Sequence, residues 1–152
     1  MSGEYVERLK RRALGFLREA EAAEDSDLAA FFAEQAMNLY IKAVFYEIFG
    51  ERIVGHGLRS LLGRVSENLR KHGYFNDAER ISGFVDEQRR WLILAEDAYT
   101  GARYGDMDYS RDDAEALRKV ARNLIEVLDQ VVENVKLGYA SFRSSEEVEG
   151  VC

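Results

Sequence analysis

The segment LAAFFAEQAMNLYIKAVFYEIF, residues 28–49, is apolar on most of its circumference when it is drawn as a helix. A helix that is apolar nearly all round belongs in the middle of a bundle. Its polar residues Glu34, Asn38 and Lys42 follow one another at a spacing of four, with Gln35 beside them, and form a single strip. We therefore predict a central helix that begins after a cap at Asp25 or Ser26 and carries one polar strip.

Apolar residues recur at helical spacing on both sides of this segment, and no run alternates with period two. The predicted helices around the centre cover residues 4–23, 58–72, 77–100 and 111–137, with capping pairs Asn76–Glu79 and Ser110–Asp113 and stops at Gly73, Gly101 and Gly138. The sequence thus predicts an all-α fold, an antiparallel bundle of about five helices. We expect a single domain over 1–138 and a flexible tail over 139–152.

The composition is that of a soluble globular domain: 152 residues, 47% hydrophobic, without a single proline. A net charge of −7 argues against a generally basic nucleic-acid binder, and we interpret the basic run RLKRR (8–12) as a solvated helix face. No apolar run is long enough for a membrane span, and the N-terminus does not have a secretory pattern. We expect a cytoplasmic protein without membrane contact.

Several kinds of chemistry are disfavoured by spacing. Asp106, Asp108, Ser110 and Asp112 open like a calcium loop, but position six of that loop is Arg111 where glycine is needed, and the glutamate of position twelve is missing. Two histidines and the terminal Cys152 are too few for zinc, and neither histidine follows a glutamate at the di-iron spacing. We therefore expect no metal and no cofactor.

Two stretches carry residues in a fixed order. Residues 27–62 contain a Gln-Ala pair, a lysine, a glycine and then a histidine that opens the next helix, which here are Gln35-Ala36, Lys42, Gly50 and His56. Residues 99–109 contain Ala102-Arg103-Tyr104. Both stretches resemble HEPN domains, small prokaryotic helical domains whose later signature is Ala-Arg-Tyr. The resemblance extends over roughly residues 5–135 in the order and spacing of the helices.

The resemblance implies a homodimeric helical bundle. Many HEPN domains are metal-independent ribonucleases of toxin–antitoxin, abortive-infection or CRISPR systems, while others pair with a small nucleotidyltransferase or bind nucleotides. Catalytic members have an arginine followed, after four to six residues, by a histidine. Here no histidine follows Arg103, and positions 108–110 are Asp108, Tyr109 and Ser110. An aspartate repels phosphate and has no proton to give at neutral pH.

We therefore predict a nucleotide- or RNA-associated module that acts with a partner protein of toxin–antitoxin or defence type, without ribonuclease activity. The alternatives are a metal-independent ribonuclease toxin that uses Arg103, and a structural dimerisation scaffold without ligand. Each candidate also has a plainer role. Arg103 could complement a helix dipole, Tyr104 could pack with its hydroxyl hydrogen-bonded, and His56 could cap the third helix or pack at its entry. The candidate ligand-binding residues are Arg103, Tyr104, His56, Lys42, Gln35 and Asn38.

Overall fold

The computed structural model describes the backbone of residues 2–106 and 108–151, and the side chains of residues 3–101, 104–106 and 108–138. This part of the chain forms helices and no strand, which confirms the all-α prediction. The helices are α1 (Ser2–Ala22), α2 (Ser26–Phe49), α3 (Leu58–Lys71), α4 (Phe75–Glu87), α5 (Arg89–Ala98), α6 (Gly101–Tyr104) and α7 (Arg111–Val151).

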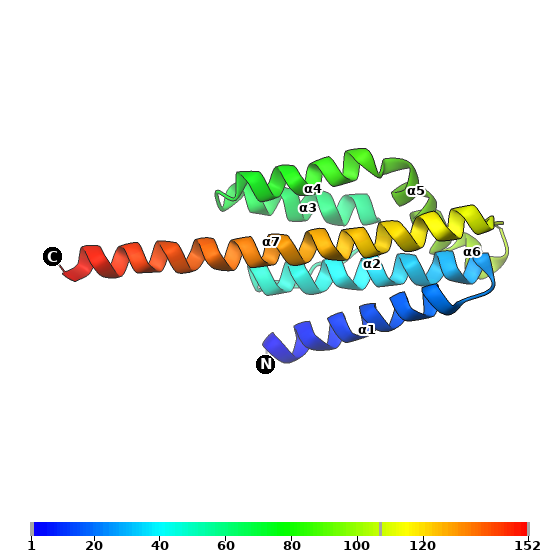
Figure 1. Cartoon of the computed structure of the whole chain (residues 1–152), viewed down its shortest axis with the longest axis horizontal. Coiled ribbons are helices and arrows are strands. Elements are labelled where there is room, and N and C mark those ends of the chain that lie inside the picture. The colour runs from blue at the N-terminus through cyan, green and yellow to red at the C-terminus, as the bar shows by residue number, and fades with distance from the viewer. Residues whose placement is uncertain (1, 107, 152) are drawn as a thin grey trace.

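Helix α2 lies at the centre, as its apolar circumference predicts. Figure 1 shows α2 and α7 side by side, with α1 along one side of the pair and α3 and α4 along the other. Asp25 caps α2 by accepting hydrogen bonds from the backbone N–H groups of Asp27 and Leu28, at 2.8 and 3.1 Å. The helix ends at Gly50, whose φ of 71° a residue with a side chain would adopt only under strain. Both ends of the central helix are therefore set locally.

Helices α3 and α7 both run parallel to α2, whereas α1 runs antiparallel to α2 and α4 antiparallel to α3 (Figure 1). Tyr40 of α2 donates a hydrogen bond to Asp129, and seven residues later Glu47 pairs with Lys136 at 3.1 Å. The two contacts are seven residues apart on each helix and follow in the same chain direction, so α2 and α7 are parallel. The apolar face of α7 is completely buried at Leu117, Ala121, Leu124 and Leu128.

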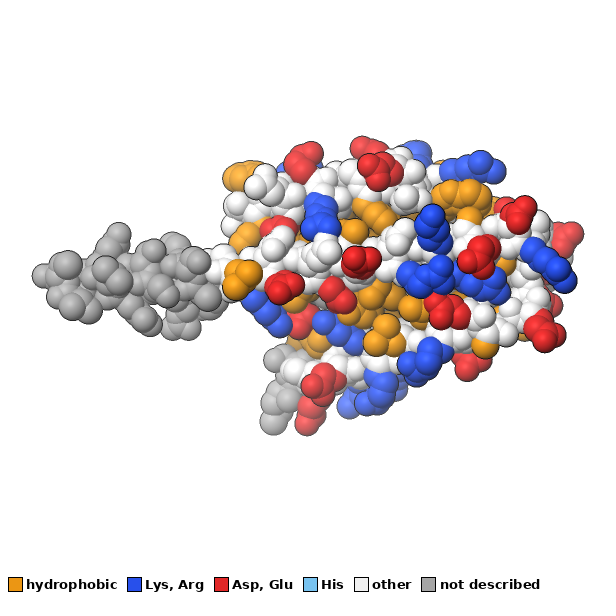
Figure 2. Space-filling view, in the orientation of Figure 1, with side chains coloured by type: hydrophobic (Ala, Val, Ile, Leu, Met, Phe, Trp, Pro, Cys, Tyr) orange, Lys and Arg blue, Asp and Glu red, His pale blue; other side chains and the backbone are white. Residues whose placement is uncertain are grey.

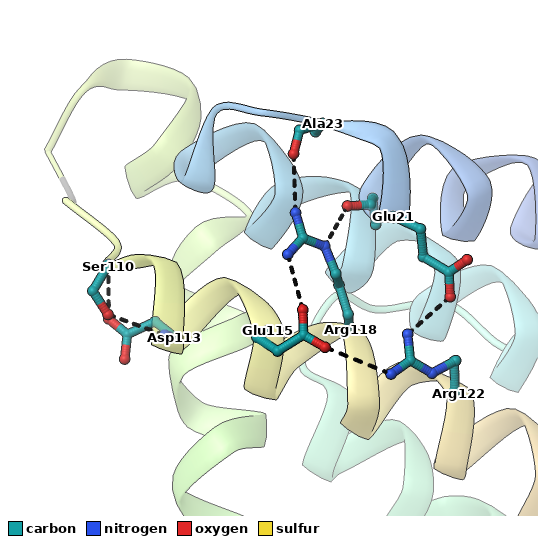
Figure 3. A network of polar contacts seen from close by, with 8 residues as sticks. Glu21, Ala23, Ser110, Asp113, Glu115, Arg118 and Arg122 are labelled. Atoms are coloured by element: carbon teal, nitrogen blue, oxygen red, sulfur yellow. Dashed lines mark hydrogen bonds and ion pairs between the residues drawn. The ribbon is translucent and has the colours of Figure 1, made fainter.

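The end of α1 is tied to the start of α7 by a polar network (Figure 3). The Arg118 guanidinium donates to the backbone oxygens of Ala20 and Ala23, at 2.7 and 2.9 Å. These carbonyls belong to the last turn of α1 and the residue after it, where the helix itself supplies no donor. Arg122 pairs with Glu21 at 2.9 Å one turn further along. This network holds α1 antiparallel to α7.

Two predictions about helix ends are wrong. The segment expected to be one helix over 77–100 is divided at Gln88, whose φ of −104° and ψ of 13° lie outside the helical region. Backbone hydrogen bonds from Gln88 to Phe84 and from Leu92 to Gln88 keep the helical spacing of apolar residues across the break. Asn76 is not a cap either: α4 begins at Phe75 after Tyr74, and Glu79 instead pairs with Arg70 of α3 at 2.9 Å. The second predicted pair does cap α7, because Ser110 and Asp113 exchange hydrogen bonds of 3.1 and 3.0 Å.

The predicted stop at Gly138 is also wrong, since α7 continues to Val151 and extends past the other helices (Figure 1). Gly138 lies against Tyr74, the residue before α4, and a β-carbon added at Gly138 would lie 3.3 Å from the Tyr74 ring. The glycine thus allows a close helix contact. The flexibility expected of residues 139–152 stays a prediction, because their side chains lie outside the described residues.

Candidate functional site

The polar strip of α2 faces the loop between α2 and α3 and the side of α5. Four candidates from the sequence come together there around Glu34, a carboxyl that the sequence places in the strip without assigning it a role. We call this set the Glu34 cluster; it consists of Glu34, Gln35, Asn38, Lys42 and His56.

Glu34 is completely buried. Its carboxylate accepts hydrogen bonds from the side-chain amides of Gln35 at 2.7 Å and Asn38 at 3.4 Å. Burial disfavours the charged form and raises the pKa of Glu34 to about 7, although both amides and the charge of Lys42 act in the opposite direction. The carboxyl can therefore accept or donate a proton near neutral pH, which is the property of a general acid or base.

Lys42 stands two turns along the strip from Glu34 and is partly buried. Burial lowers the pKa of Lys42, while the charge of Glu34 raises it. As the spacing predicts, the two residues form no ion pair within 4.0 Å, and none of the described side chains pairs with Lys42 in their place. A partly buried ammonium group without a carboxylate partner is a suitable contact for an anionic ligand.

His56 enters the cluster through both its backbone and its ring. Its carbonyl oxygen accepts a hydrogen bond of 3.2 Å from the Asn38 amide, so Asn38 links the buried carboxyl to the loop. The exposed imidazole stacks on the ring of Tyr99, with ring centres 4.5 Å apart and planes 25° apart. Of the two roles predicted for His56, capping is wrong, because Gly57 is the residue before α3 and the carboxylate that accepts from the first turn belongs to Glu96. The imidazole packs on Tyr99 beside the entry of α3 instead.

A salt bridge lies beside the cluster and holds α5 against the start of α3. The Arg59 guanidinium donates to Glu96 at 2.7 Å, and the same carboxylate accepts from the backbone N–H of Arg59 at 3.4 Å. Glu96 adds negative charge near Glu34 and contributes to its raised pKa. A β-carbon at Gly57 would lie 3.3 Å from the Glu96 carboxylate. The loop can therefore approach α5 closely enough to bring His56 onto Tyr99.

The remaining two candidates are on α6, a single turn that packs against both α2 and α5. The side chain of Arg103 lies outside the described residues. Its backbone, however, follows Tyr99 by four positions, and Tyr99 and Thr100 both have right-handed helical dihedral angles. Residue 103 therefore stands about one helical turn beyond the ring that stacks on His56. Tyr104 is 67% exposed, so the packing role predicted for it is wrong.

The acidic segment after α6 acts as a corner between helices. Tyr109 is its buried tyrosine: its hydroxyl donates to the backbone oxygen of Leu94 at 2.9 Å, and its N–H donates to Asp27 at 2.8 Å. Burial and the charges of nearby aspartates raise the pKa of Tyr109 to about 12. Ser110 and Asp113 are occupied in the cap of α7 (Figure 3). Within the described ranges, no three His, Cys, Asp or Glu side chains gather as a metal site would require.

Sequence reasoning missed Tyr99, Glu96 and the raised pKa of Glu34. Tyr99 precedes the family signature and reads as one more apolar position of a helix, whereas its ring meets a loop residue 43 positions earlier. One signal was present: a glutamate in a segment that is otherwise apolar all round must be desolvated, and a desolvated carboxyl has a raised pKa.

Comparison with known proteins gives one match. The sequence model of the HEPN domain family matches residues 6–131, which include the whole Glu34 cluster and α6. No curated protein and no solved structure matches the chain. In the described part of the chain, we find no helix with the length and hydrophobicity needed to cross a lipid bilayer.

Proposed function

This chain belongs to the HEPN domain family, and from that membership we propose that its Glu34 cluster binds a nucleotide or an RNA strand and that the domain acts beside a partner protein. The observation that carries the proposal is the Asn38 amide, which joins the buried carboxyl of Glu34 to the His56 loop. Amides, a titrating carboxyl, a stacked imidazole and a lysine thus meet at one place.

These groups match the parts of a nucleotide. Lys42 can contact a phosphate, because no described carboxylate neutralises it. The carboxyl of Glu34 is completely buried, so it orients the amide of Gln35, which is partly exposed and can donate to or accept from a hydroxyl or a base edge. The stacked rings of His56 and Tyr99 offer an aromatic surface beside the cluster. Arg103 would add a second cation from α6.

The test is nucleotide-dependent stabilisation. A nucleotide at a hundred times its dissociation constant should increase the free energy of unfolding by about 2.7 kcal/mol. We expect this increase with AMP, ATP or GTP for the wild type and for Lys119→Met, which removes an exposed charge of α7. Lys42→Met should reduce it. If none of these nucleotides stabilises the protein, the binding proposal is wrong and the scaffold function takes its place.

A ribonuclease is the second candidate, and the stacking of His56 on Tyr99 is the observation that favours it. This contact holds an imidazole on the ring of Tyr99, whose backbone stands about one helical turn before that of Arg103, although no histidine follows Arg103 in the sequence. RNA cleavage needs a group that takes the 2′-hydroxyl proton and a cation that stabilises the charged phosphorus centre. His56, whose imidazole is exposed, could serve as that base.

The two functions are separated by incubating the protein with mixed RNA in the presence of a metal chelator. Under the binding proposal, RNA stays intact with the wild type, His56→Ala and Arg103→Ala alike. Cleavage by the wild type that both substitutions abolish would establish the ribonuclease instead.

The proposal about a partner protein is based on the family to which the chain belongs, and not on a contact in the structure. We propose a homodimer that works with a small nucleotidyltransferase or another protein of a toxin–antitoxin or defence pair. Co-expression with the product of a neighbouring gene, followed by size-exclusion chromatography, checks this: a complex heavier than a dimer is expected, and a lone monomer would contradict it.

A further inference from the structure

Helix α1 exposes a row of arginines on the side that faces away from the bundle. Arg8, Arg11, Arg12 and Arg18 are exposed, and their spacing, with Gly15 between them, places them on one face of the helix. At 1.5 Å per residue the row is about 15 Å long. Figure 2 shows basic side chains along the lower edge of the molecule, where Figure 1 places α1. We call these four residues the arginine row.

No ion pair within 4.0 Å joins any of the four arginines to a described carboxylate. Arg80, Arg89 and Lys119, which are exposed on other helices, also lack such a pair, so the arginine row is distinguished by four cations that share one helix face. Exposed carboxylates of the same helix, such as Glu7 and Glu19, form no ion pair with the row. A guanidinium nitrogen of Arg18 lies 3.7 Å from the position of a β-carbon at Gly15, one turn back toward Arg11 and Arg12. The charges are therefore gathered in spite of their mutual repulsion.

From this concentration of unneutralised guanidinium groups we infer that the arginine row binds the phosphate backbone of double-helical RNA. The inference rests on the proposed function, from which it takes RNA as the ligand. It adds a second contact surface, because α1 packs on α2 and α7, while the Glu34 cluster faces α3 and α5. Guanidinium groups suit phosphate oxygens because they donate two parallel hydrogen bonds.

The composition of the face favours a duplex over a single strand. Single strands are held by basic grooves combined with aromatic side chains on which bases stack. The aromatic residues of α1, Tyr5 and Phe16, are partly buried against Tyr46 and Phe32 of α2 and are not available as such a platform. Duplex RNA is recognised by shape and by phosphate and hydroxyl contacts, for which stacking is not needed. An acidic protein fits less well, since interfaces between proteins have an apolar core and the exposed large apolar side chain described on α1 is Leu14 alone, at 38%.

The experiment compares two triple variants of equal charge. One is Arg8→Gln with Arg11→Gln and Arg12→Gln; the control is Arg80→Gln with Arg89→Gln and Lys119→Gln, all exposed on other helices. Glutamine is nearly as good a helix former as arginine, so both should fold, which circular dichroism checks. Binding of a labelled RNA hairpin with a blunt stem is measured by fluorescence anisotropy at several salt concentrations.

We expect the control to bind the hairpin within about twofold of the wild type, and the α1 variant to bind it at least about tenfold more weakly. Each lost phosphate contact reduces the slope of log affinity against log salt by about 0.7–0.9, so the slope of the α1 variant should fall by roughly 2–3. Equal affinity of the two variants would overturn the inference. So would equally tight binding of the single strand or of a DNA duplex. Displacement of the hairpin by poly-glutamate at equal charge would assign the face to an acidic protein instead.

Nucleotide stabilisation distinguishes the failure of this inference from the failure of the proposed function. The α1 variant keeps the Glu34 cluster, so AMP, ATP or GTP should stabilise it as much as the wild type. If nucleotides stabilise both but the arginine row does not affect the hairpin, the inference about the row alone is wrong.

Discussion

Helix α2 carries a glutamate in each half, and the two carboxyls are held in opposite ways. Glu34 is bound by amides, and burial raises its pKa to about 7. Glu47, about 20 Å further along the helix, accepts from Lys10 at 2.8 Å and from Lys136 at 3.1 Å. Burial favours its neutral form, but these two lysines outweigh burial and lower the pKa of Glu47. Glu34 therefore titrates near neutral pH, whereas Glu47 on the same helix stays ionised there.

Each half of α2 also has a histidine against an aromatic ring. His56 stacks on Tyr99 beside Glu34, and His72 lies 5.4 Å from the Phe49 ring near Glu47, where its Nδ1 contacts the carbonyl oxygen of Asn68 at 2.8 Å. A cavity of about 550 Å³ opens at this second end, lined by Glu47, Ile48, Phe49, His72, Tyr74, Val132, Val135 and Lys136. The two carboxyls differ in their partners. Lys10 of α1 and Lys136 of α7 keep Glu47 ionised and connect three helices through it. The partners of Glu34 are neutral amides, so its carboxyl can take up or release a proton near neutral pH.

The largest effect is expected from Glu34→Gln. The folded pKa of Glu34 lies above 4.5, the ordinary value of a glutamate, so the folded state holds the proton more tightly and stability falls as pH rises through about 7. A shift from 4.5 to about 7 corresponds to about 3 kcal/mol. Glutamine imitates the protonated carboxyl, so the variant should be more stable than the wild type at pH 8–9 by up to that amount. Urea unfolding between pH 5 and 9 measures the difference, which should disappear toward pH 5.

Glu47→Gln is the control for this experiment. It removes the same charge from the same helix, so a general effect of net charge would stabilise both variants at high pH. If Glu34→Gln is no more stable than the wild type at pH 9, the carboxyl is not desolvated in the folded protein and the comparison fails.

A smaller effect of opposite sign is expected from Glu47→Gln. The substitution removes two charged hydrogen bonds whose lysines are partly exposed, so we expect a loss of about 1 kcal/mol at pH 7. A depressed folded pKa contributes stability above the ordinary glutamate value, and this is lost as pH falls through the folded pKa. The deficit of the variant should therefore shrink below about pH 4. Urea unfolding at pH 3.5 and 7 checks this, and a constant deficit would contradict the role of charge.

Most of the fold follows from the sequence because apolar spacing is a local property. The circumference of residues 28–49 identifies the central helix, and Asp25 and Gly50 end it as their residue types predict. Glycine gives a weaker signal, because it has more than one physical use. Gly50 has a positive φ and stops a helix, whereas Gly138 continues one and gives Tyr74 space to approach. A residue type alone does not distinguish these two uses.

The candidate site is predictable to the extent that it lies on one helix. The spacing of Glu34, Asn38 and Lys42 gives the strip, and the hydrogen bond between Glu34 and Asn38 confirms that they share a face. The contacts with His56 and Tyr99 could not be found in this way, since they join segments that meet only in the folded chain. The protonation of Glu34 depends on how completely its neighbours exclude water, which is a property of packing.

The smallest effect concerns the two histidines, and it tests whether the rings at the two ends are independent. Tyr99→Leu removes the ring that stacks on His56 and should cost about 0.5–1.5 kcal/mol, a usual value for an aromatic pair. The sharper measurement is NMR of the histidine ring protons, because a stacked ring shifts its neighbour's resonances to high field. We expect the His56 signals to move to low field in the variant, while those of His72, which lies against Phe49, stay in place. Unchanged His56 signals would mean that the imidazole does not rest on Tyr99 in solution, and His56 could then not serve as the base of the ribonuclease alternative.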